Sequence, residues 1–301
     1  MSKKLFILST KAGKGEFVQL EKDIINTYKN HNREDEIEIV KTKYKDHSID
    51  LARDFSKKDY KDKIIIVCGG DGSLSEVSNT LVNTNTALGL IPMGTGNDFS
   101  KNFNYKNFKI EDTFEPKVLP IDMIKVNEKY CINVMSLGFD TQVLEKTYDI
   151  LEQEPNLGNK AFLKGIVKSL KNIKYENLEL DLVLKDNTKI NVKDEYIVSA
   201  LCNGSYYGSG FNPSPKGKID DGILNLIAVK KLPLYKVIPI LLLYKTGKHM
   251  GLKSVTEYLV KSGVIKSNKE IIANIDGEIF RSKEFEFEIL KNSLKWAYFN
   301  Y

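Results

Sequence analysis

The fold of this chain turns on the stretch Val67-Cys68-Gly69-Gly70-Asp71-Gly72-Ser73-Leu74-Ser75-Glu76-Val77. The apolar, mostly β-branched run that leads into it, residues 64–68, is typical of a buried central strand. After the glycines, the spacing of Leu74, Val77 and Leu81 predicts one face of a helix. Ser73 is placed as its N-cap and Glu76 as the capping-box partner. The stretch therefore predicts a strand, a glycine turn and a helix.

A turn of this kind suits a phosphate group. Backbone N–H groups and the start of a helix converge where glycine lets a ligand come close. Asp71 is the unusual residue, because a carboxylate beside an anion is unfavourable. It becomes favourable if a cation lies between the two, or if the carboxylate accepts hydrogen bonds from the loop. Mg²⁺ is the natural candidate for the cation, since it prefers carboxylate and phosphate oxygens.

The first third of the chain alternates strands with helices, which predicts βαβ units and a mostly parallel sheet. Ser48 is expected to cap one of these helices, and Asn97 or Asp98 another. Ligands bind such sheets beyond the carboxyl ends of the strands. Three loops rich in small and polar residues fall at that edge: 9–15, 69–73 and 92–99. The predicted strands are 5–8, 37–40, 64–68 and 87–91.

From about residue 118 onward, β signals dominate and predict a second domain built mainly of antiparallel strands with helical insertions. Asn127-Glu128 separates two apolar runs and predicts a hairpin turn. We expect domains at 1–118 and 119–291, with the tail 292–301 returning to the first. The predicted strands of the second half are 121–126, 130–134, 178–184, 189–192, 197–202, 224–229, 271–275, 285–289 and 294–299. The predicted helices fall within 141–174 and 233–245.

Composition bounds the class of protein. The 301 residues are 42% hydrophobic and 28% charged, which argues against a disordered chain or a coiled coil. The net charge of +5 is spread along the sequence. It favours anionic partners mildly and is too dispersed to indicate nucleic-acid binding. No segment reaches the roughly 20 apolar residues that a membrane-spanning helix needs.

The cysteines indicate a reducing compartment. Cys68, Cys131 and Cys202 are odd in number and form no CxxC pair, so neither a disulfide framework nor a zinc site is expected. Each has an apolar, strand-like context and is predicted to be a buried thiol. The apolar run at the amino terminus is too short for a signal peptide, and we expect a cytoplasmic protein.

Five motifs occur in order along the chain, and together they carry a resemblance. They are Gly69-Gly70-Asp71-Gly72-Ser73 with Glu76, Gly94-Thr95-Gly96-Asn97-Asp98, Tyr206-Tyr207-Gly208, Asp220-Asp221-Gly222 and Asp276-Gly277-Glu278. The chain resembles the diacylglycerol kinase catalytic-domain family, and most closely its soluble bacterial lipid kinases. The resemblance runs from the first predicted strand nearly to the last residue.

The resemblance implies ATP-dependent phosphorylation of a lipid hydroxyl, with diacylglycerol as the first expected acceptor. It implies an α/β fold of two domains with the active site in the cleft between them. The first would be a Rossmann-like, phosphofructokinase-like nucleotide-binding domain, and the second a β-rich antiparallel sandwich. The residues implied to hold the ATP phosphates are Gly69, Gly70, Asp71, Gly72, Ser73, Leu74, Ser75 and Glu76. Those implied to line the rest of the nucleotide site are Thr10, Lys11, Ala12, Gly13, Lys14, Thr42, Gly94, Thr95 and Asn97.

The resemblance also implies roles in catalysis and metal binding. Asp276 and Glu278 match the motif that supplies the catalytic base, and Asp71 is expected to act through Mg²⁺. A structural Mg²⁺ site is implied at Lys218, Asp221 and Ile223, the first and last through their backbone carbonyls. Asp122 lies within an apolar strand and needs a partner if it is buried. We expect that partner to be this metal or Lys125.

Two departures leave alternatives open. The first loop reads Ser9-Thr10-Lys11-Ala12-Gly13, where the family usually has Asn-Pro-x-x-Gly, and Ser73 replaces a threonine. A non-catalytic nucleotide or lipid sensor is therefore one alternative. A NAD kinase is another, although Ser78-Asn79-Thr80 stands where an Asn-Glu pair is expected. Candidate membrane contacts are residues 232–244 and the lysine-bearing segment 141–174, whose default interpretation is a solvated face. A homodimer is a further alternative.

Overall fold

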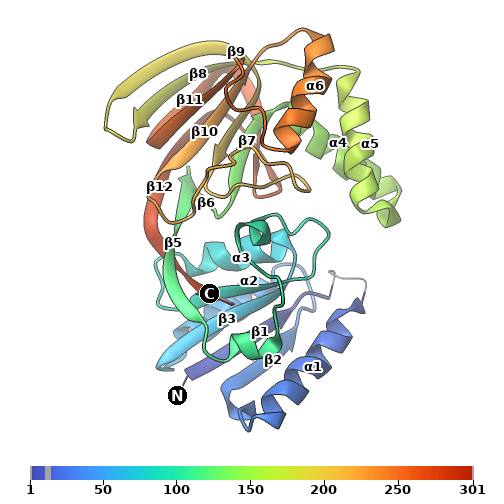
Figure 1. The fold of residues 1–301 in the computed structure, drawn as a ribbon, viewed down its shortest axis with the longest axis vertical. Coiled ribbons are helices and arrows are strands. Elements are labelled where there is room, and N and C mark those ends of the chain that lie inside the picture. Colours follow the sequence, from blue (N-terminus) through green and yellow to red (C-terminus); the bar gives the residue numbers. More distant parts are fainter. Residues whose placement is uncertain (1, 11–14, 300–301) are drawn as a thin grey trace. The chain divides into compact units, whose positions relative to one another are not determined.

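The computed structural model describes residues 2–10 and 15–299. The chain divides into two compact units. Unit 1 contains residues 1–121 and 292–301, and unit 2 contains residues 122–291. Two strands, β5 (Lys117–Val126) and β12 (Glu278–Tyr298), begin in one unit and end in the other (Figure 1).

Unit 1 is built on a parallel sheet in the order β2-β1-β3-β4. Its strands are β1 (Ser2–Leu8), β2 (Ile37–Lys41), β3 (Asp62–Gly69) and β4 (Ala87–Pro92). Leu8 lies beside Lys41 on one side and Cys68 on the other, so these strands end at one edge. The end of β12 adds to β4 in parallel, with Lys295 beside Ala87.

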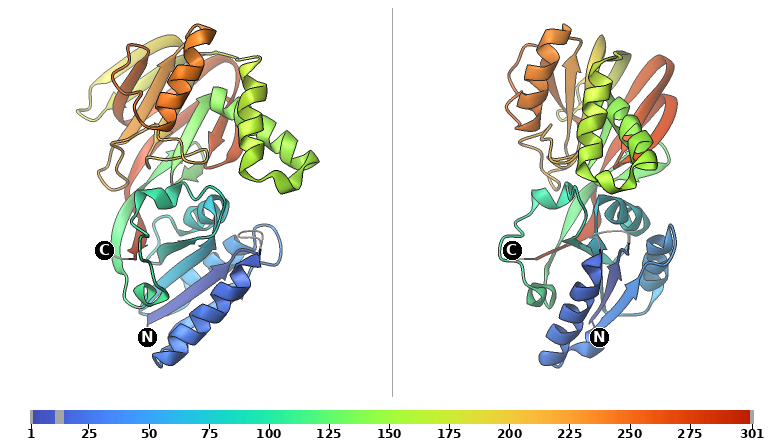
Figure 2. Two further views of the ribbon diagram at one scale, coloured as in Figure 1. Left: turned by 45° about the vertical axis from the view of Figure 1, so that its right-hand side comes forward. Right: turned by 90° about the vertical axis from the view of Figure 1, so that its right-hand side faces the viewer.

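Helices cover both faces of this sheet. They are α1 (Phe17–Asn30), α2 (His47–Lys57) and α3 (Asp71–Leu81), with short 3₁₀ helices at Glu34–Glu36 (η2), Phe99–Asn102 (η3) and Ile110–Thr113 (η4). Ile24 and Tyr28 of α1 pack with Phe6 and Ile66 of the strands. In Figure 2, α1 lies on the face of the sheet opposite α2. Both faces are thus apolar, as the continuous runs in β1 and β3 predict.

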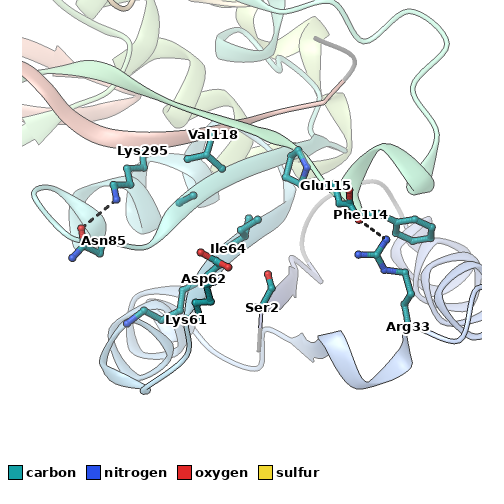
Figure 3. Close-up of a pocket in the computed structure, with 13 residues that line it drawn as sticks. Ser2, Arg33, Lys61, Asp62, Ile64, Asn85, Phe114, Glu115, Val118 and Lys295 are labelled. Carbon is teal, nitrogen blue, oxygen red and sulfur yellow. Dashed lines mark hydrogen bonds and ion pairs between the residues drawn. The ribbon is translucent and has the colours of Figure 1, made fainter.

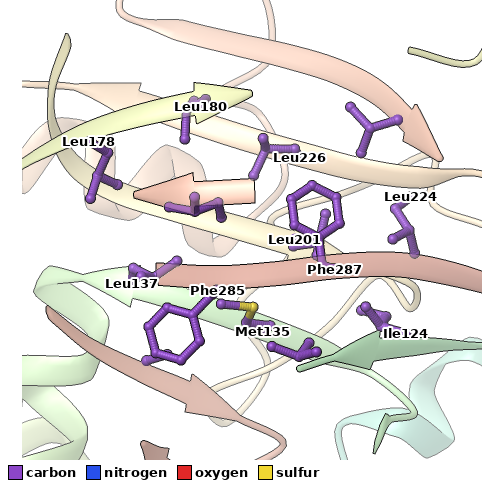
Figure 4. Packing of buried hydrophobic residues seen from close by; sticks show 14 of the residues in the cluster. Ile124, Met135, Leu137, Leu178, Leu180, Leu201, Leu224, Leu226, Phe285 and Phe287 are labelled. Atoms are coloured by element: carbon purple, nitrogen blue, oxygen red, sulfur yellow. The ribbon is translucent and has the colours of Figure 1, made fainter. Parts of the chain in front are cut away.

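Unit 2 is an antiparallel assembly of strands. Besides parts of β5 and β12, it contains β6 (Lys129–Cys131), β7 (Val134–Gly138), β8 (Glu176–Leu184), β9 (Lys189–Cys202), β10 (Leu224–Lys230) and β11 (Val255–Ile275). Within unit 2 these strands pair with one another in antiparallel fashion. Leu180, Leu201 and Leu226 meet Phe285 and Phe287 in its core (Figure 4).

Three helices cover a second apolar cluster of unit 2. They are α4 (Phe139–Gln153), α5 (Asn159–Leu170) and α6 (Leu234–Lys245), and a 3₁₀ turn, η5 (Pro155–Leu157), joins the first two. Ile166 of α5 and Val237 of α6 belong to the same cluster as Ala200 of β9 and Ile227 of β10. Because β9 and β10 alternate their side chains, one face feeds the strand core and the other meets the helices.

The two-domain α/β architecture and the hairpin at Asn127-Glu128 are confirmed. Four predicted strand limits are wrong. Residues 130–134 are divided between β6, which ends at Cys131, and β7, which begins at Val134. Residues 189–192 and 197–202 form one strand, β11 begins at Val255 rather than at residue 271, and β12 runs unbroken through residues 290–293. Polar residues between the apolar runs suggested turns. In β11 the pairing register shifts between Lys266 and Ile271, so the strand absorbs this polar segment as an irregularity.

Candidate active site

The carboxyl ends of the strands in unit 1 bring the first loop and Thr42 together. The backbone N–H of Ser9 donates to Cys68 at 2.9 Å, and that of Thr42 donates to Leu8 at 2.9 Å. Thr10 is hydrogen-bonded to Thr42 through both its backbone and its hydroxyl. Its N–H donates to Thr42 Oγ1 at 3.2 Å, and its hydroxyl donates to the Thr42 carbonyl at 3.0 Å. The predicted nucleotide residues Lys11, Ala12, Gly13 and Lys14 lie outside the described residues.

The glycine turn is tighter than the sequence suggested. Helix α3 begins at Asp71 with extended Gly70 as its N-cap, so the predicted Ser73 N-cap and Glu76 capping box are wrong. Ser73 instead donates to Ser9 Oγ at 3.2 Å. Glu76 accepts a hydrogen bond from Ser48, which likewise does not cap α2. These side-chain hydrogen bonds therefore connect α3 to the first loop through Ser73 and to α2 through Glu76.

The two glycine-rich turns pack directly against each other. A Cβ added at Gly94 would lie 2.5 Å from the Cα of Gly70, which only glycine avoids. Asn97 closes the second turn, since its Oδ1 accepts from Gly94 N–H at 2.8 Å and its Nδ2 donates to the Gly94 carbonyl at 2.7 Å. Gly72 differs from both, because a Cβ there would meet no atom within 4 Å. The first turn of α3 is thus open at Gly72 and closed at Gly70.

Asp71 links these turns through its carboxylate. It accepts from the N–H of Asp98 at 3.0 Å and from that of Phe99 at 3.1 Å, at the start of η3. Asp98 is the N-cap residue of this helix, one of the two residues predicted, but its side chain makes no capping hydrogen bond, and Asp71 accepts the N–H groups there instead. Burial raises the pKa of Asp71 and the charge of Asp98 adds to the rise, while the two N–H donors oppose it. Asp98 is itself paired with Lys101.

The other predicted nucleotide residues differ in exposure. Leu74 is fully buried in the core of unit 1, so its side chain faces away from any ligand at the turn. Thr95 is exposed and Ser75 is half-buried. For Leu74, only the backbone can contribute to the predicted phosphate site.

In unit 2, Asp276 stands at the two-residue turn between β11 and β12. Its φ is +47° and that of Gly277 is +95°, which is typical of a tight hairpin turn. The Asp276 carboxylate accepts three backbone N–H groups, from Ile132 at 2.7 Å and from Asn133 and Val134 at 3.1 Å each. The thiol of Cys131 donates to it at 3.2 Å. Burial raises the pKa of Asp276 to about 6, against the effect of these four donors.

Further bonds hold the same turn from behind. Gly277 N–H donates to Asn274 Oδ1 at 2.7 Å, and Tyr148 of α4 donates to the Gly277 carbonyl. Burial raises the pKa of Tyr148, and the charge of Glu278 adds to it. Glu278 itself is exposed. Sequence reasoning missed Cys131, Asn274 and Tyr148. The position of Asn274 two residues before Asp276 was the available signal, because an Asn side chain often bonds the backbone of a nearby turn.

The predicted metal residues belong to the loop 218–223, which is hydrogen-bonded to Asp122. This aspartate is fully buried, its Oδ2 accepts from Gly222 N–H at 2.7 Å, and its own N–H donates to the Ile219 carbonyl at 2.6 Å. Asp221 Oδ1 accepts from Ile223 N–H at 3.1 Å. A carboxylate with backbone carbonyls is a donor set that suits Mg²⁺. The expected alternative partner, Lys125, forms an ion pair with Glu288.

Within the described part of the chain, no cluster of three or more His, Cys, Asp or Glu side chains is fit to hold a metal ion. A site of one carboxylate and two backbone carbonyls would form no such cluster.

A pocket of about 710 Å³ lies at the other end of the unit 1 strands (Figure 3). It is lined by Ser2 of β1, Asp62 of β3 and Ala87 of β4, together with Arg33 and Lys295. These strand residues stand at the amino ends of a parallel sheet. The pocket is therefore separate from the glycine turns, and it includes none of the predicted nucleotide residues.

Two family models match successive stretches of the chain. Residues 3–126 match the family model of the diacylglycerol kinase catalytic domain, and residues 133–297 match that of the YegS C-terminal NAD kinase beta sandwich-like domain. The chain belongs to the YegS-like lipid kinase family. The members of this family are transferases, so the chain is a lipid kinase. A kinase uses ATP as its phosphate donor.

Curated relatives agree with this membership, and a solved structure shares the fold. A probable YegS-like lipid kinase from Shewanella frigidimarina is 28% identical over 77% of this chain and 75% of its own length. One from Yersinia pestis is 29% identical over 77% of both chains. A putative diacylglycerol kinase from Bacillus anthracis has the same fold, with a TM-score of 0.76 at 23% identity. The match covers 99% of this chain and 97% of that one.

Proposed function

We propose that this YegS-like lipid kinase transfers the γ-phosphate of ATP to a lipid hydroxyl, with diacylglycerol as the acceptor. The observation that supports ATP binding in this proposal is the pair of glycine turns joined through Asp71. Their position at the carboxyl edge of a parallel sheet is where such sheets bind ligands. The open first turn of α3 at Gly72 leaves room for a phosphate, whereas a side chain at Gly94 would not fit.

In this proposal ATP·Mg²⁺ supplies the phosphoryl group and neutralises part of its charge. The N–H groups at the start of α3 hold the phosphates, because the first N–H groups of a helix have no partner within it. Thr10, Thr42, Thr95 and Asn97 line the nucleotide. Asp71 is a positioning residue, since its oxygens accept the N–H groups of Asp98 and Phe99 and so fix the second turn against the first.

Glu278 is the group we assign as the base at the acceptor hydroxyl. Its carboxylate is exposed and stands on a turn fixed by Asp276, Asn274 and Tyr148. A base must reach the hydroxyl proton, and an exposed carboxylate on a rigid turn meets that need. Asp276 already accepts four donors, so we assign it the role of holding the turn rather than of taking the proton.

We also propose a structural Mg²⁺ ion bound by the Asp221 carboxylate and the carbonyls of Lys218 and Ile223. Asp122 supports this site because its carboxylate accepts the N–H of Gly222, the residue between Asp221 and Ile223. The site would tie the 218–223 loop to β5. Peripheral contact with a membrane follows from a lipid acceptor and is developed below. The expected cytoplasmic location, the homodimer and the active site in an interdomain cleft stay predictions.

The test is transfer of labelled γ-phosphate from ATP to a panel of lipid alcohols in mixed micelles, with NAD⁺ as a parallel acceptor. We expect label in the diacylglycerol product and none in NADP⁺. Label in NAD⁺ alone would make the chain a NAD kinase. Label in no acceptor, with ATP still bound, would favour the nucleotide sensor.

A further inference from the structure

Helix α6 of unit 2 is apolar on all sides and yet exposes one face. Val237 and Tyr244 are buried against the strands, whereas four large apolar side chains point away from them. Their exposed fractions are 60% for Leu234, 75% for Tyr235, 53% for Ile238 and 63% for Leu242. Positions 234, 238 and 242 recur every four residues, so they form one stripe along the helix.

This exposed stripe is unusual for a helix at a water-facing surface. A helix that is apolar all round is normally buried on every side or spans a membrane. At 12 residues α6 is shorter than the roughly 20 residues required to span a bilayer. None of the helices in the described part of the chain meets the length and hydropathy of a membrane span. A helix with these properties can instead lie in a membrane interface with its apolar face inserted.

The charge around α6 identifies the kind of surface that it fits. Between residues 223 and 256 the sequence has six lysines and no aspartate or glutamate. Lys230 and Lys231 pair with acidic residues of β9. The other four, Lys236, Lys245, Lys248 and Lys253, are exposed, and none of them forms an ion pair with another residue that the structure describes. A basic segment bearing an apolar stripe is complementary to an anionic bilayer, where each lysine near the surface adds attraction.

We propose that the stripe formed by Leu234, Tyr235, Ile238 and Leu242 inserts into the headgroup region of an anionic lipid bilayer. The exposed lysines of residues 236–253 contact its phosphates. The choice of a bilayer over a protein partner rests on the proposed lipid acceptor, which resides in a membrane. Helix α6 would thus place unit 2 on the surface from which the acceptor is taken.

The test is sedimentation of the full chain with vesicles of phosphatidylcholine, with and without phosphatidylglycerol, in the absence of ATP. We expect binding to the anionic vesicles. The double variant Ile238→Gln/Leu242→Gln should weaken that binding about 10-fold or more, because two large side chains lose their burial. The matched control is Val18→Gln/Ile25→Gln, which removes two exposed apolar side chains from α1 in unit 1 and should leave vesicle binding unchanged.

A second readout places the helix itself in the membrane. The chain has one tryptophan, Trp296, which is buried in unit 1. Added fluorescence in Tyr235→Trp should be quenched by brominated lipids, whereas that of Trp296 should not be. Vesicle binding by the α6 variant equal to that of the unchanged chain would overturn the proposal. So would a change from dimer to monomer in the variant, since it would assign the stripe to a second copy of the chain.

Failure of the lipid-kinase proposal gives a different pattern. In that case the chain would bind anionic vesicles through α6 and yet label no lipid in the micelle assay. If only the α6 inference fails, the micelle assay labels a lipid and the α6 variant binds vesicles normally.

Discussion

The carboxylate of Asp71 accepts the backbone N–H of Asp98 at 3.0 Å and thereby joins two glycine turns that are 27 residues apart in sequence. A second bond, from Phe99 N–H at 3.1 Å, makes the attachment bidentate. Asp71 opens α3 while its side chain caps η3. The two turns therefore form one rigid unit, and a change at either should be felt at the other.

The first prediction separates the packed glycine from the open one. Gly94→Ala should destabilise unit 1, because its Cβ would lie 2.5 Å from Gly70 Cα. Overpacking of this kind costs about 1–3 kcal/mol. Gly72→Ala should leave stability unchanged, or raise it by up to about 1 kcal/mol through better helix propensity. It should nevertheless weaken ATP binding.

Urea unfolding and nucleotide titration on both variants check this prediction. The two variants serve as controls for each other, since each adds one methyl group to a glycine of the same site. Unchanged ATP affinity in a folded Gly72→Ala variant would show that the ATP phosphates do not bind at this turn.

The second prediction concerns pH and Asp276. Its pKa is about 6 in the folded chain, against 3.8 for a free side chain. The folded state therefore holds the proton more tightly than the unfolded state. This contribution to stability is complete below about pH 4 and is lost as the pH rises through about 6. A shift of this size corresponds to at most about 3 kcal/mol.

The measurement is the difference in unfolding free energy between the unchanged chain and Asp276→Asn from pH 4 to pH 7. The unchanged chain should lose stability relative to the variant over that range. Asp54→Asn makes the same substitution at an exposed carboxylate of α2 and is the control against which the slope is compared. A flat difference for Asp276→Asn would mean that its four donors keep the carboxylate charged throughout.

The third prediction tests the proposed structural metal. Mg²⁺ should raise the midpoint of thermal unfolding and EDTA should lower it. At a concentration 100-fold above the dissociation constant the stabilisation would be about 2.7 kcal/mol. Asp221→Asn should abolish the response. Asp220→Asn changes the neighbouring exposed carboxylate and should retain it. An equal response in both variants would contradict a site at Asp221.

Much of this molecule could be predicted from the sequence because its signals are local. The apolar run before Gly69 and the alternation of strands with helices gave the parallel sheet, and Asn127-Glu128 gave a hairpin. The predicted N-cap of α3 was wrong, because Gly70, Asp71 and Ser73 are each compatible with the start of a helix. Which one caps depends on the second turn, 27 residues away.

The sequence also failed to predict the full lengths of β11 and β12 and the residues that bond the Asp276-Gly277-Glu278 motif. In β11 and β12 the polar segments read as turns, although pairing with neighbouring strands carries the chain through them. The four donors to Asp276 come from residues 131–134, which are 142 or more positions earlier. No local pattern reports such a contact. The sequence singles out Asp276 and Glu278 through their motif, and the geometry is the basis for the separate roles that we propose for them.

The most direct test of the central claim is the rate of γ-phosphate transfer to diacylglycerol by Glu278→Gln, with ATP binding measured on the same protein. Loss of a general base typically costs about 10²–10⁴-fold in rate. We expect a loss in that range with unchanged ATP affinity. Transfer at the unchanged rate by Glu278→Gln, or no transfer to any lipid by the unchanged chain, would contradict the account.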